Sequence, residues 1–254
     1  MLGQTTLLFQ QKTSTGLIEV FQKDNQRWLT IDAIEQSRID IEQGEKLVTA
    51  LHEAFLAVLL FTETPKKVLL AGLGGGALAR YLHSIHPEIT GVAVEKDGLI
   101  ADLATRYFSF PEKNWSIITD DIRHWHDETY DFIVADIAED VLTPAWLTSN
   151  KMLLQFKQQL SSDGVLVINF LVTDAQSFSR ELTTIREIFK RRTLCLSVPE
   201  HKNVVVIAFN NQPSYASKAQ LNSRVMALTA LWGFDFNVLL SQLLKDNPVG
   251  SGIL

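Results

Sequence analysis

From Lys66 onward, short apolar segments of strand length alternate with longer amphipathic segments of helix length. The apolar segments are KVLLAG, ITGVAVE, WSIITDD, YDFIVADI and GVLVINFL. Strands that are apolar throughout must be buried on both faces, and the helices of the crossover connections supply that cover. The alternation therefore predicts a parallel sheet between two layers of helices.

Two further apolar segments, RRTLCLSV and NVVVIAF, break this alternation. Only PEHKN separates them, which is too short for a parallel crossover, so the two strands must be antiparallel. Seven strands ending in such a hairpin are the layout of S-adenosylmethionine-dependent methyltransferases, whereas an ordinary dinucleotide-binding fold has six parallel strands. The sequence thus predicts an α/β, Rossmann-like fold of the methyltransferase type, followed by one helical stretch over residues 218–244.

The first part of the chain has a different pattern. GLIEVFQ and RWLTIDA flank the polar tetrad KDNQ, which indicates a hairpin with a four-residue turn. TTLLFQQ and IEQSRID extend this hairpin to a small β-meander, and a helical pattern follows over residues 45–61. We therefore expect an N-terminal β-strand domain over residues 1–44 and a methyltransferase-like domain over residues 45–254.

The composition argues against several classes of protein. A net charge of −6 makes a nucleic-acid partner improbable, because such proteins need a basic face. Cys195 is the single cysteine, so no disulfide framework can form within the chain. The first residues lack the pattern of a secretory signal, and no apolar run reaches the length of a membrane span. We expect a cytoplasmic protein that binds small molecules.

A glycine-rich turn, GLGGGA, follows the first apolar strand and opens a helix. Gly72, Gly74, Gly75 and Gly76 permit positive φ and let the backbone approach a ligand closely. Turns of this kind bind nucleotides, but the motif fits a dinucleotide as well as S-adenosylmethionine. A tight strand–helix turn without any ligand would also look like this.

Two carboxylates at strand ends narrow the choice of ligand. Glu95 ends the second apolar strand, where a carboxylate can accept both ribose hydroxyls of either nucleotide. Asp121 ends the third strand, where methyltransferase-like folds use a carboxylate to accept from the exocyclic amine of adenine. The N–H of the next residue, Ile122, would donate to the ring. Asp121 could also cap the short helix that follows, and the two roles are compatible.

The sequence indicates no metal site and no prosthetic group. His124 and His126 are spaced as two ligands could be, but no third or fourth ligand can be identified for them, so exposed histidines are the simpler interpretation. The nucleoside would then be a co-substrate such as S-adenosylmethionine.

Several segments, taken in order, resemble the spermidine synthase (polyamine aminopropyltransferase) family. VLLAGLGGGALARYL resembles its glycine loop G-G-G-D-G-G-x-x-R-E, VAVEKD resembles V-E-I-D, and TDDIRHW resembles G-D-A-R-x-F. VADIAEDVLTPAWL lies where the family has D-S-S-D-P-x-G-P-A. Upstream, LHEAFLAVLL resembles Y-H-E-M-L-A-H-L-P-L, and IDAIEQS resembles L-D-G-x-x-Q. The resemblance covers most of the chain.

This resemblance implies a reaction and its residues. Family members transfer an aminopropyl group from decarboxylated S-adenosylmethionine to putrescine or a related amine by direct displacement. Asp136 would accept the proton of the amine, and Glu139 would bind the far part of the amine. His52 and Gln36 match the histidine and glutamine of the upstream motifs and would contribute to the donor site. The resemblance also implies a homodimer.

Two positions depart from the family pattern. Gly75 stands where the family has an aspartate that holds the aminopropyl ammonium and repels the carboxylate of intact S-adenosylmethionine, so we expect the glycine to leave room for that carboxylate. Leu51 replaces a tyrosine that orients the amine. Three functions stay open: an aminopropyltransferase, a methyltransferase that uses S-adenosylmethionine itself, and a nucleoside-binding protein without catalysis.

Overall fold

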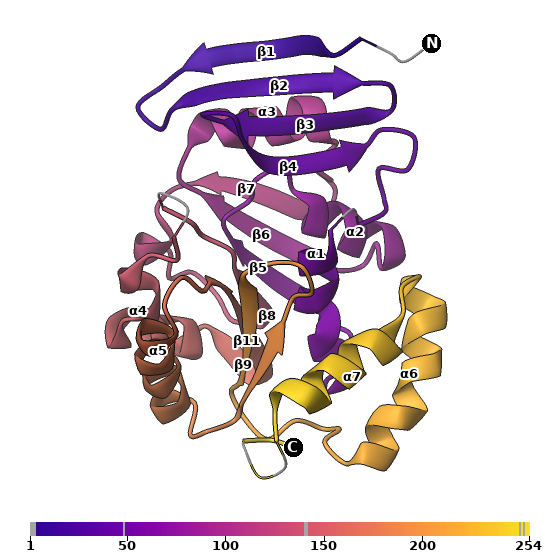
Figure 1. Cartoon of the computed structure of the whole chain (residues 1–254), viewed down its shortest axis with the longest axis vertical. Helices are drawn as coiled ribbons and strands as arrows, with labels where there is room; N and C mark the ends of the chain where they lie inside the picture. The colour runs from indigo at the N-terminus through magenta and orange to yellow at the C-terminus, as the bar shows by residue number, and fades with distance from the viewer. Residues whose placement is uncertain (1–3, 48, 140–141, 249, 251) are drawn as a thin grey trace.

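The computed structural model describes residues 4–47, 49–139, 142–248, 250 and 252–254. Within these ranges the strands form two separate sheets (Figure 1). The N-terminal sheet is an antiparallel meander in chain order. Its strands are β1 (Thr6–Lys12), β2 (Leu17–Lys23), β3 (Gln26–Ile31) and β4 (Ile34–Asp40).

The second sheet has seven strands within the described ranges, in the order β10-β11-β9-β8-β5-β6-β7. The pairs from β9 to β7 are parallel, while β10–β11 and β11–β9 are antiparallel. The strands are β5 (Lys67–Ala71), β6 (Thr90–Glu95), β7 (Trp115–Thr119), β8 (Tyr130–Ala135), β9 (Leu160–Leu171), β10 (Thr193–Ser197) and β11 (Asn203–Phe209). The predicted methyltransferase-type sheet with its C-terminal hairpin is confirmed.

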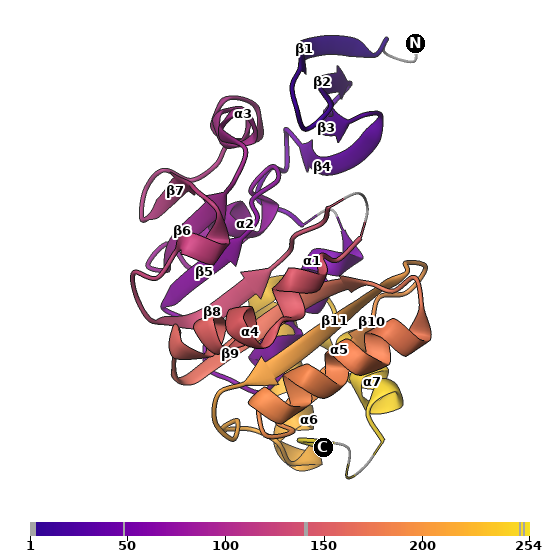
Figure 2. The ribbon, with the colours of Figure 1, turned by 90° about the vertical axis from the view of Figure 1, so that its left-hand side faces the viewer.

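Helices cover both faces of the large sheet (Figures 1 and 2). One face packs on α1 (Ala50–Phe55), η1 (Leu56–Leu60), α2 (Ala77–Ile85), α6 (Lys218–Trp232) and α7 (Phe236–Asp246). The other face packs on α4 (Asn150–Gln158) and α5 (Ala175–Ile188). Along β5, Val68 and Leu70 belong to the first core and Leu69 to the second, because successive side chains of a strand point to opposite faces.

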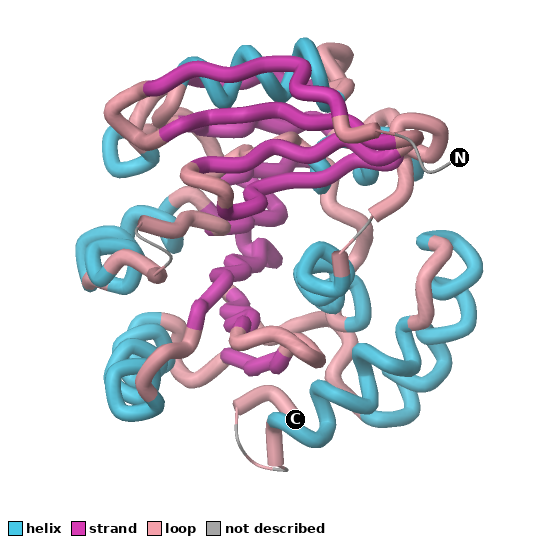
Figure 3. The backbone as a smooth tube through the Cα atoms, turned by 45° about the horizontal axis from the view of Figure 1, so that its top comes forward, coloured by secondary structure: helices cyan, strands magenta, loops and turns pink. Residues whose placement is uncertain are grey.

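The N-terminal sheet lies on helix α3 (Gly98–Phe108), as Figures 2 and 3 show. Ile18, Val20 and Leu29 of the sheet form a small buried core with Ile100 and Leu103 of the helix. This packing holds Gln36 and Ser37 of β4 beside the glycine-rich turn that follows β5.

Two local predictions are wrong in detail. In the first hairpin, Lys23 pairs with Gln26, so only Asp24 and Asn25 form the turn, with Asp24 at a positive φ of 51°. The shorter turn wins because two-residue connections fit the twist of adjacent strands. The helical pattern predicted over residues 45–61 begins only at Ala50 and becomes a 3₁₀-helix at its end.

The predicted helical stretch over residues 218–244 is two helices. Gly233 ends α6 in a left-handed conformation, with φ +71°, which is a common way to terminate a helix. The Asp235 side chain then accepts the backbone N–H of Asn237 and caps the start of α7. Among the described helices, none is long and apolar enough to cross a membrane.

Candidate functional site

The candidate site lies where the strand order of the large sheet reverses. The chain moves outward from β5 to β6 and β7 and then returns to the other side of β5 to form β8. Ligands of open α/β sheets bind outside the carboxyl ends of the strands at such a reversal. Here the N–H of Asp136 donates to the carbonyl of Ala71 (2.9 Å), and the N–H of Gly72 donates to the carbonyl of Val94 (3.0 Å). The ends of β5, β6 and β8 therefore meet at one point.

Glycine is required at two positions of the turn. Gly72 has a φ of +91°, and a Cβ there would overlap the carbonyl oxygen of Asp136 and lie 3.2 Å from its carbonyl carbon. Gly76 caps the start of α2 at a φ of +68°. Arg80 holds the turn in place: its side chain is 6% exposed and donates to the carbonyls of Gly75 and Phe108. Burial lowers the Arg80 pKa to about 10.

Glu95, expected to bind ribose, is anchored to the backbone of the same turn. One of its carboxylate oxygens accepts from the N–H of Leu73 (3.1 Å) and the other from the N–H of Asp97 (2.9 Å). Burial raises the Glu95 pKa, although these backbone hydrogen bonds oppose the rise. Backbone N–H groups thus hold the carboxylate beside the turn, and these groups persist when the side chains of their residues are substituted.

Asp121, expected to bind adenine, stands at the start of η2 (Ile122–His124) and accepts the N–H of Arg123 (2.9 Å), which confirms the capping role. The Arg123 guanidinium also binds this carboxylate through Nε and Nη2. The guanidinium lowers the Asp121 pKa to about 2. Ile122 is buried, and its carbonyl accepts from the Gln155 amide (2.9 Å).

Asp136, expected to accept a proton, follows β8 and is oriented by a neighbouring side chain. Its Oδ1 accepts from Nδ2 of Asn169 on β9 (2.8 Å). The oxygen of the Asn169 amide accepts in turn from Nδ2 of Asn203 on β11 (2.9 Å). Because the Asn203 contact occupies the amide oxygen of Asn169, the amide nitrogen is the end that faces Asp136.

His52 lies close enough to Asp136 for the two to interact electrostatically. Burial is the main cause that lowers the His52 pKa; the Arg80 charge also lowers it, and Asp136 only partly opposes them. The ring nitrogen Nδ1 is hydrogen-bonded to Oγ1 of Thr49. We therefore expect a neutral imidazole at pH 7, which adds no positive charge beside Asp136.

Glu139 lies beyond Asp136 on the connection after β8, where it forms an isolated β-bridge with Leu142. Its Oε1 accepts from the indole N–H of Trp146 (3.3 Å). The same indole ring lies under the Arg123 guanidinium, with 4.9 Å between the guanidinium carbon and the ring centroid. Asp140, the next residue in the sequence, lies outside the described residues.

Gln36 approaches the glycine turn with its backbone rather than its side chain. It is the extra residue of an irregular pairing, because Glu35 and Ser37 on either side pair with successive residues of β3. Its carbonyl oxygen lies 3.7 Å from the place of a Cβ on Gly74. The Gln36 amide donates to the carbonyl of Ile34 (3.2 Å), and the side chain is exposed.

The expectation that Gly75 leaves room for a ligand carboxylate stays a prediction, and the structure shows only what a side chain at this position would meet. A Cβ on Gly75 would overlap Oγ of Ser37 and would lie 2.9 Å from the Ser37 Cβ and 3.1 Å from the Phe108 ring. Ser37 of the N-terminal sheet and Phe108 of α3 therefore pack beside Gly75.

Sequence reasoning missed two residues that contact the predicted ones. Asn169 is a polar residue within the apolar segment GVLVINFL, and a buried polar side chain usually needs a partner. That signal could have pointed to Asn169 but not to Asp136 as its partner. Arg123 lies two residues after Asp121, and nothing in the sequence shows that its side chain returns to that carboxylate.

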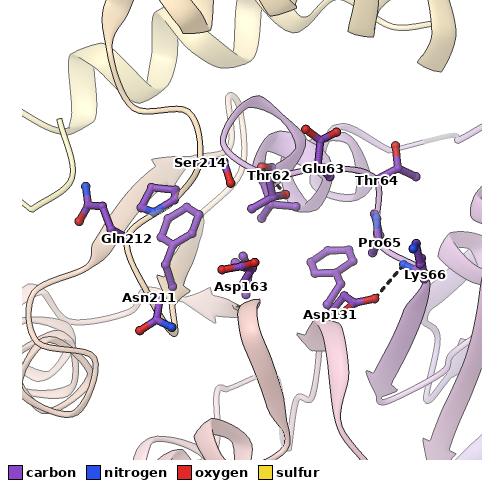
Figure 4. Close-up of a pocket in the computed structure, with 15 residues that line it drawn as sticks. Thr62, Glu63, Thr64, Pro65, Lys66, Asp131, Asp163, Asn211, Gln212 and Ser214 are labelled. Atoms are coloured by element: carbon purple, nitrogen blue, oxygen red, sulfur yellow. Dashed lines mark hydrogen bonds between the residues drawn. The ribbon is translucent and has the colours of Figure 1, made fainter.

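A separate hollow of about 240 Å³ opens at the opposite edge of the large sheet (Figure 4). It is lined by residues at the amino ends of the strands, among them Lys66, Asp131 and Asp163. The Asp131 carboxylate accepts the backbone N–H of Lys66 (2.9 Å), the contact drawn in Figure 4. None of the predicted site residues lines this hollow. We place the candidate site at the carboxyl ends of the strands instead, because hydrogen bonds connect Asp136, the glycine turn and Glu95 there.

Within the described part of the chain, no three His, Cys, Asp or Glu side chains form a group that could hold a metal ion. His124 is exposed and lies 3.7 Å from a carboxylate oxygen of Asp120. The sequence-based expectation of a site without metal stays a prediction.

Comparison with known proteins finds similar chains among the polyamine aminopropyltransferases and, over shorter parts, among methyltransferases. No protein-family model matches the chain. A polyamine aminopropyltransferase of Vibrio vulnificus is 32% identical over 200 residues, which cover 74% of this chain and 67% of the relative. A polyamine aminopropyltransferase of Chromobacterium violaceum is 28% identical over 246 residues, which cover 93% of each chain.

Solved structures support the fold. The crystal structure of a probable spermidine synthase from Corynebacterium glutamicum superposes with a TM-score of 0.72 at 16% identity. The match covers 100% of this chain and 96% of the other. The similarity therefore includes the N-terminal sheet as well as the large sheet.

Proposed function

This chain belongs to the polyamine aminopropyltransferase family and is a transferase, and from that membership we propose that it transfers the aminopropyl group of decarboxylated S-adenosylmethionine to an amine of the putrescine class. The observation that carries the proposal is the position of Asp136. Its carboxylate stands at the reversal of strand order, beside the glycine turn, and is oriented by Asn169.

The donor would bind along the ends of β5, β6 and β7. The glycine turn would approach the donor with its backbone, Glu95 would accept the ribose hydroxyls, and Asp121 with the Ile122 N–H would bind adenine. The proposed donor-binding residues are Gly72, Gly74, Gly75, Gly76, Glu95, Asp121, Ile122, His52 and Gln36.

The proposed reaction is a single displacement. The amine nitrogen forms a bond to the methylene carbon beside the sulfonium, the bond from that carbon to sulfur breaks, and methylthioadenosine leaves. The attacking amine is an ammonium ion at neutral pH, so it must first lose a proton, which Asp136 would accept. The protein would contribute alignment of the two reactants as well as proton transfer.

The neighbours of Asp136 suit a cationic amine. The neutral His52 imidazole does not repel the amine, and Glu139 lies farther along the same connection, where it would bind the second ammonium group. Glu139 contacts Trp146, whose indole ring would form part of the amine-binding wall.

The methyltransferase alternative rests on the space that Gly75 would leave for the carboxylate of intact S-adenosylmethionine. It is distinguished from the proposed reaction by its product, because methyl transfer would yield S-adenosylhomocysteine. The nucleoside-binding alternative differs from the proposed function only in the absence of turnover, which is directly measurable.

The test is an assay of purified protein with each donor and a panel of diamines, in which the products are identified by mass spectrometry. The proposal expects methylthioadenosine and an aminopropylated amine from the decarboxylated donor. Asp136→Asn should lower kcat by about 10²- to 10⁴-fold while methylthioadenosine binding is retained. Formation of S-adenosylhomocysteine, or undiminished turnover by D136N, would contradict the proposal.

We further propose that the protein acts in the cytoplasm as a homodimer, with a strand domain over residues 1–44 and a catalytic domain over residues 45–254. These expectations derive from the family resemblance and the sequence pattern. Sedimentation equilibrium tests the dimer, and limited proteolysis near residue 44 tests the domain boundary.

A further inference from the structure

The contact between Arg123 and Asp121 engages both oxygens of the carboxylate that is proposed to bind adenine. Oδ1 accepts from the Arg123 backbone N–H and from Nε, both at 2.9 Å, and Oδ2 accepts from Nη2 and, at 3.1 Å, from Nε. A carboxylate offers about four acceptor positions. The three Arg123 N–H groups use most of these positions, and the Asp121 side chain is only 13% exposed. An adenine amine therefore competes with the guanidinium for this carboxylate.

The Arg123 guanidinium also joins the two loops that border the site. It leaves the loop after β7 and lies over the Trp146 ring, 4.9 Å from its centroid. Trp146 belongs to η3 (Ala145–Thr148), which follows the connection after β8, and its indole N–H donates to Glu139 (3.3 Å). The guanidinium thus lies between a group of the proposed nucleobase pocket and a group of the proposed amine pocket.

We propose that Arg123 competes with the nucleobase for Asp121 and thereby controls the affinity of the donor site. This inference rests on the proposed role of Asp121 in binding adenine. The Arg123 side chain is 44% exposed, so it can move into solvent without disturbing the core. Exposed ion pairs and exposed guanidinium–indole contacts are individually weak. Displacement by a nucleobase is therefore feasible and lowers nucleoside affinity only moderately.

Arg123→Met tests the inference, because methionine keeps an unbranched apolar stem of similar reach and removes every side-chain donor. The probe is methylthioadenosine, which has no net charge, and the measurement is titration calorimetry. We expect R123M to bind methylthioadenosine about 3- to 10-fold more tightly than the wild type. Equal or weaker binding by R123M would overturn the inference.

Ionic strength gives a second readout that a merely structural role would not change. Salt screens the exposed Arg123–Asp121 pair but does not act directly on an uncharged nucleoside. Wild-type affinity should therefore increase when the salt concentration rises from about 0.05 M to about 0.5 M, and R123M affinity should stay constant. The same salt response in both proteins would overturn the inference.

The matched control is Arg106→Met. Arg106 forms an exposed ion pair with Asp102 on α3 (2.7 Å), so this variant loses the same charge and a similar contact away from the site. Its affinity and salt response should equal those of the wild type. Turnover by the wild type together with unchanged R123M binding would refute this inference alone. Tighter R123M binding without turnover of any donor by the wild type would support it and refute the proposed reaction alone.

Discussion

In the candidate site, Glu95 and the glycine turn on the proposed nucleoside side are held in place differently from Asp136 and Glu139 on the proposed amine side. On the nucleoside side, Glu95 accepts hydrogen bonds from backbone N–H groups, and Arg80 binds the backbone carbonyls that support the glycine turn. On the amine side, Asp136 is oriented by the Asn169 side chain, and Glu139 contacts the Trp146 side chain.

This difference separates what related enzymes can share from what they can vary. A contact to the backbone survives most substitutions, because every residue except proline supplies an N–H. A contact between side chains is lost when either residue changes. The part of the site around Glu95 is thus tied to the fold. The contacts of Asp136, Glu139 and Asp121 involve other side chains and can change while the fold persists.

The largest predicted effect on stability comes from adding a side chain at Gly72, where the backbone lies close to the carbonyl of Asp136. Gly72→Ala would place a methyl group against the carbonyl of Asp136 at a φ of +91°, and it should lower the free energy of unfolding by about 3 kcal/mol or more. Gly233→Ala is the matched control: it shares a positive φ, but nothing lies within 4 Å of the added methyl group, so it should lower that free energy by about 1–2 kcal/mol. If urea denaturation gives the same loss of unfolding free energy for both variants, the ends of β5 and β8 do not lie as close together as the structure shows.

Asn169→Ala tests the amine half. Loss of a hydrogen bond to a charged group is worth about 1.5–3 kcal/mol, so kcat should fall about 10- to 100-fold, while methylthioadenosine affinity stays unchanged. Asn203→Ala should have a smaller effect on kcat, because Asn203 acts on Asp136 only through Asn169. A parallel loss of nucleoside affinity would mean that the two halves are not independent.

Gly75→Asp tests the packing between the N-terminal sheet and the glycine turn. The aspartate would collide with Ser37, and overpacking of this kind lowers the free energy of unfolding by about 1–3 kcal/mol. In the Ser37→Gly background the same substitution should be less destabilising, although the Phe108 ring stays in contact. Strict additivity of the two substitutions in a double-mutant cycle would contradict the observed contact.

The smallest predicted effect is the pH dependence of nucleoside binding. Burial raises the Glu95 pKa above its ordinary value of 4.5, and protonation removes acceptor capacity for the ribose hydroxyls. Methylthioadenosine affinity should therefore decrease by a factor of a few as the pH falls from about 7 toward about 4, with a midpoint above 4.5.

The control for this pH dependence is Asp121→Asn. The Asp121 pKa of about 2 lies outside the titrated range, so this variant should keep the same midpoint even if its affinity is lower. If the midpoint disappears in D121N, Asp121 rather than Glu95 is the group that titrates, and the prediction is contradicted.

Much of the fold, and the edge of the sheet at which the candidate groups gather, could be predicted from the sequence. Apolar strands must be buried on both faces, and PEHKN is too short for a parallel crossover; these two facts were enough for the sheet and its hairpin. The same strand ends brought Glu95, Asp121 and Asp136 to one edge. The break at Gly233 was missed because apolar residues continue on both sides of it, although a glycine before a capping aspartate was visible.

What the sequence by itself determined is therefore the succession of strands and helices along the chain and the identity of the groups at the carboxyl ends of the strands, because both follow from local periodicity and from the rules that connect parallel strands. Only the tertiary structure decided which side chain each group contacts: Asn169 beside Asp136, Ser37 in the space next to Gly75, and Arg123 on Asp121. The physical reason is that these contacts depend on distances of a few ångströms between packed elements and on side-chain rotamers, and neither leaves a periodic signal along the chain.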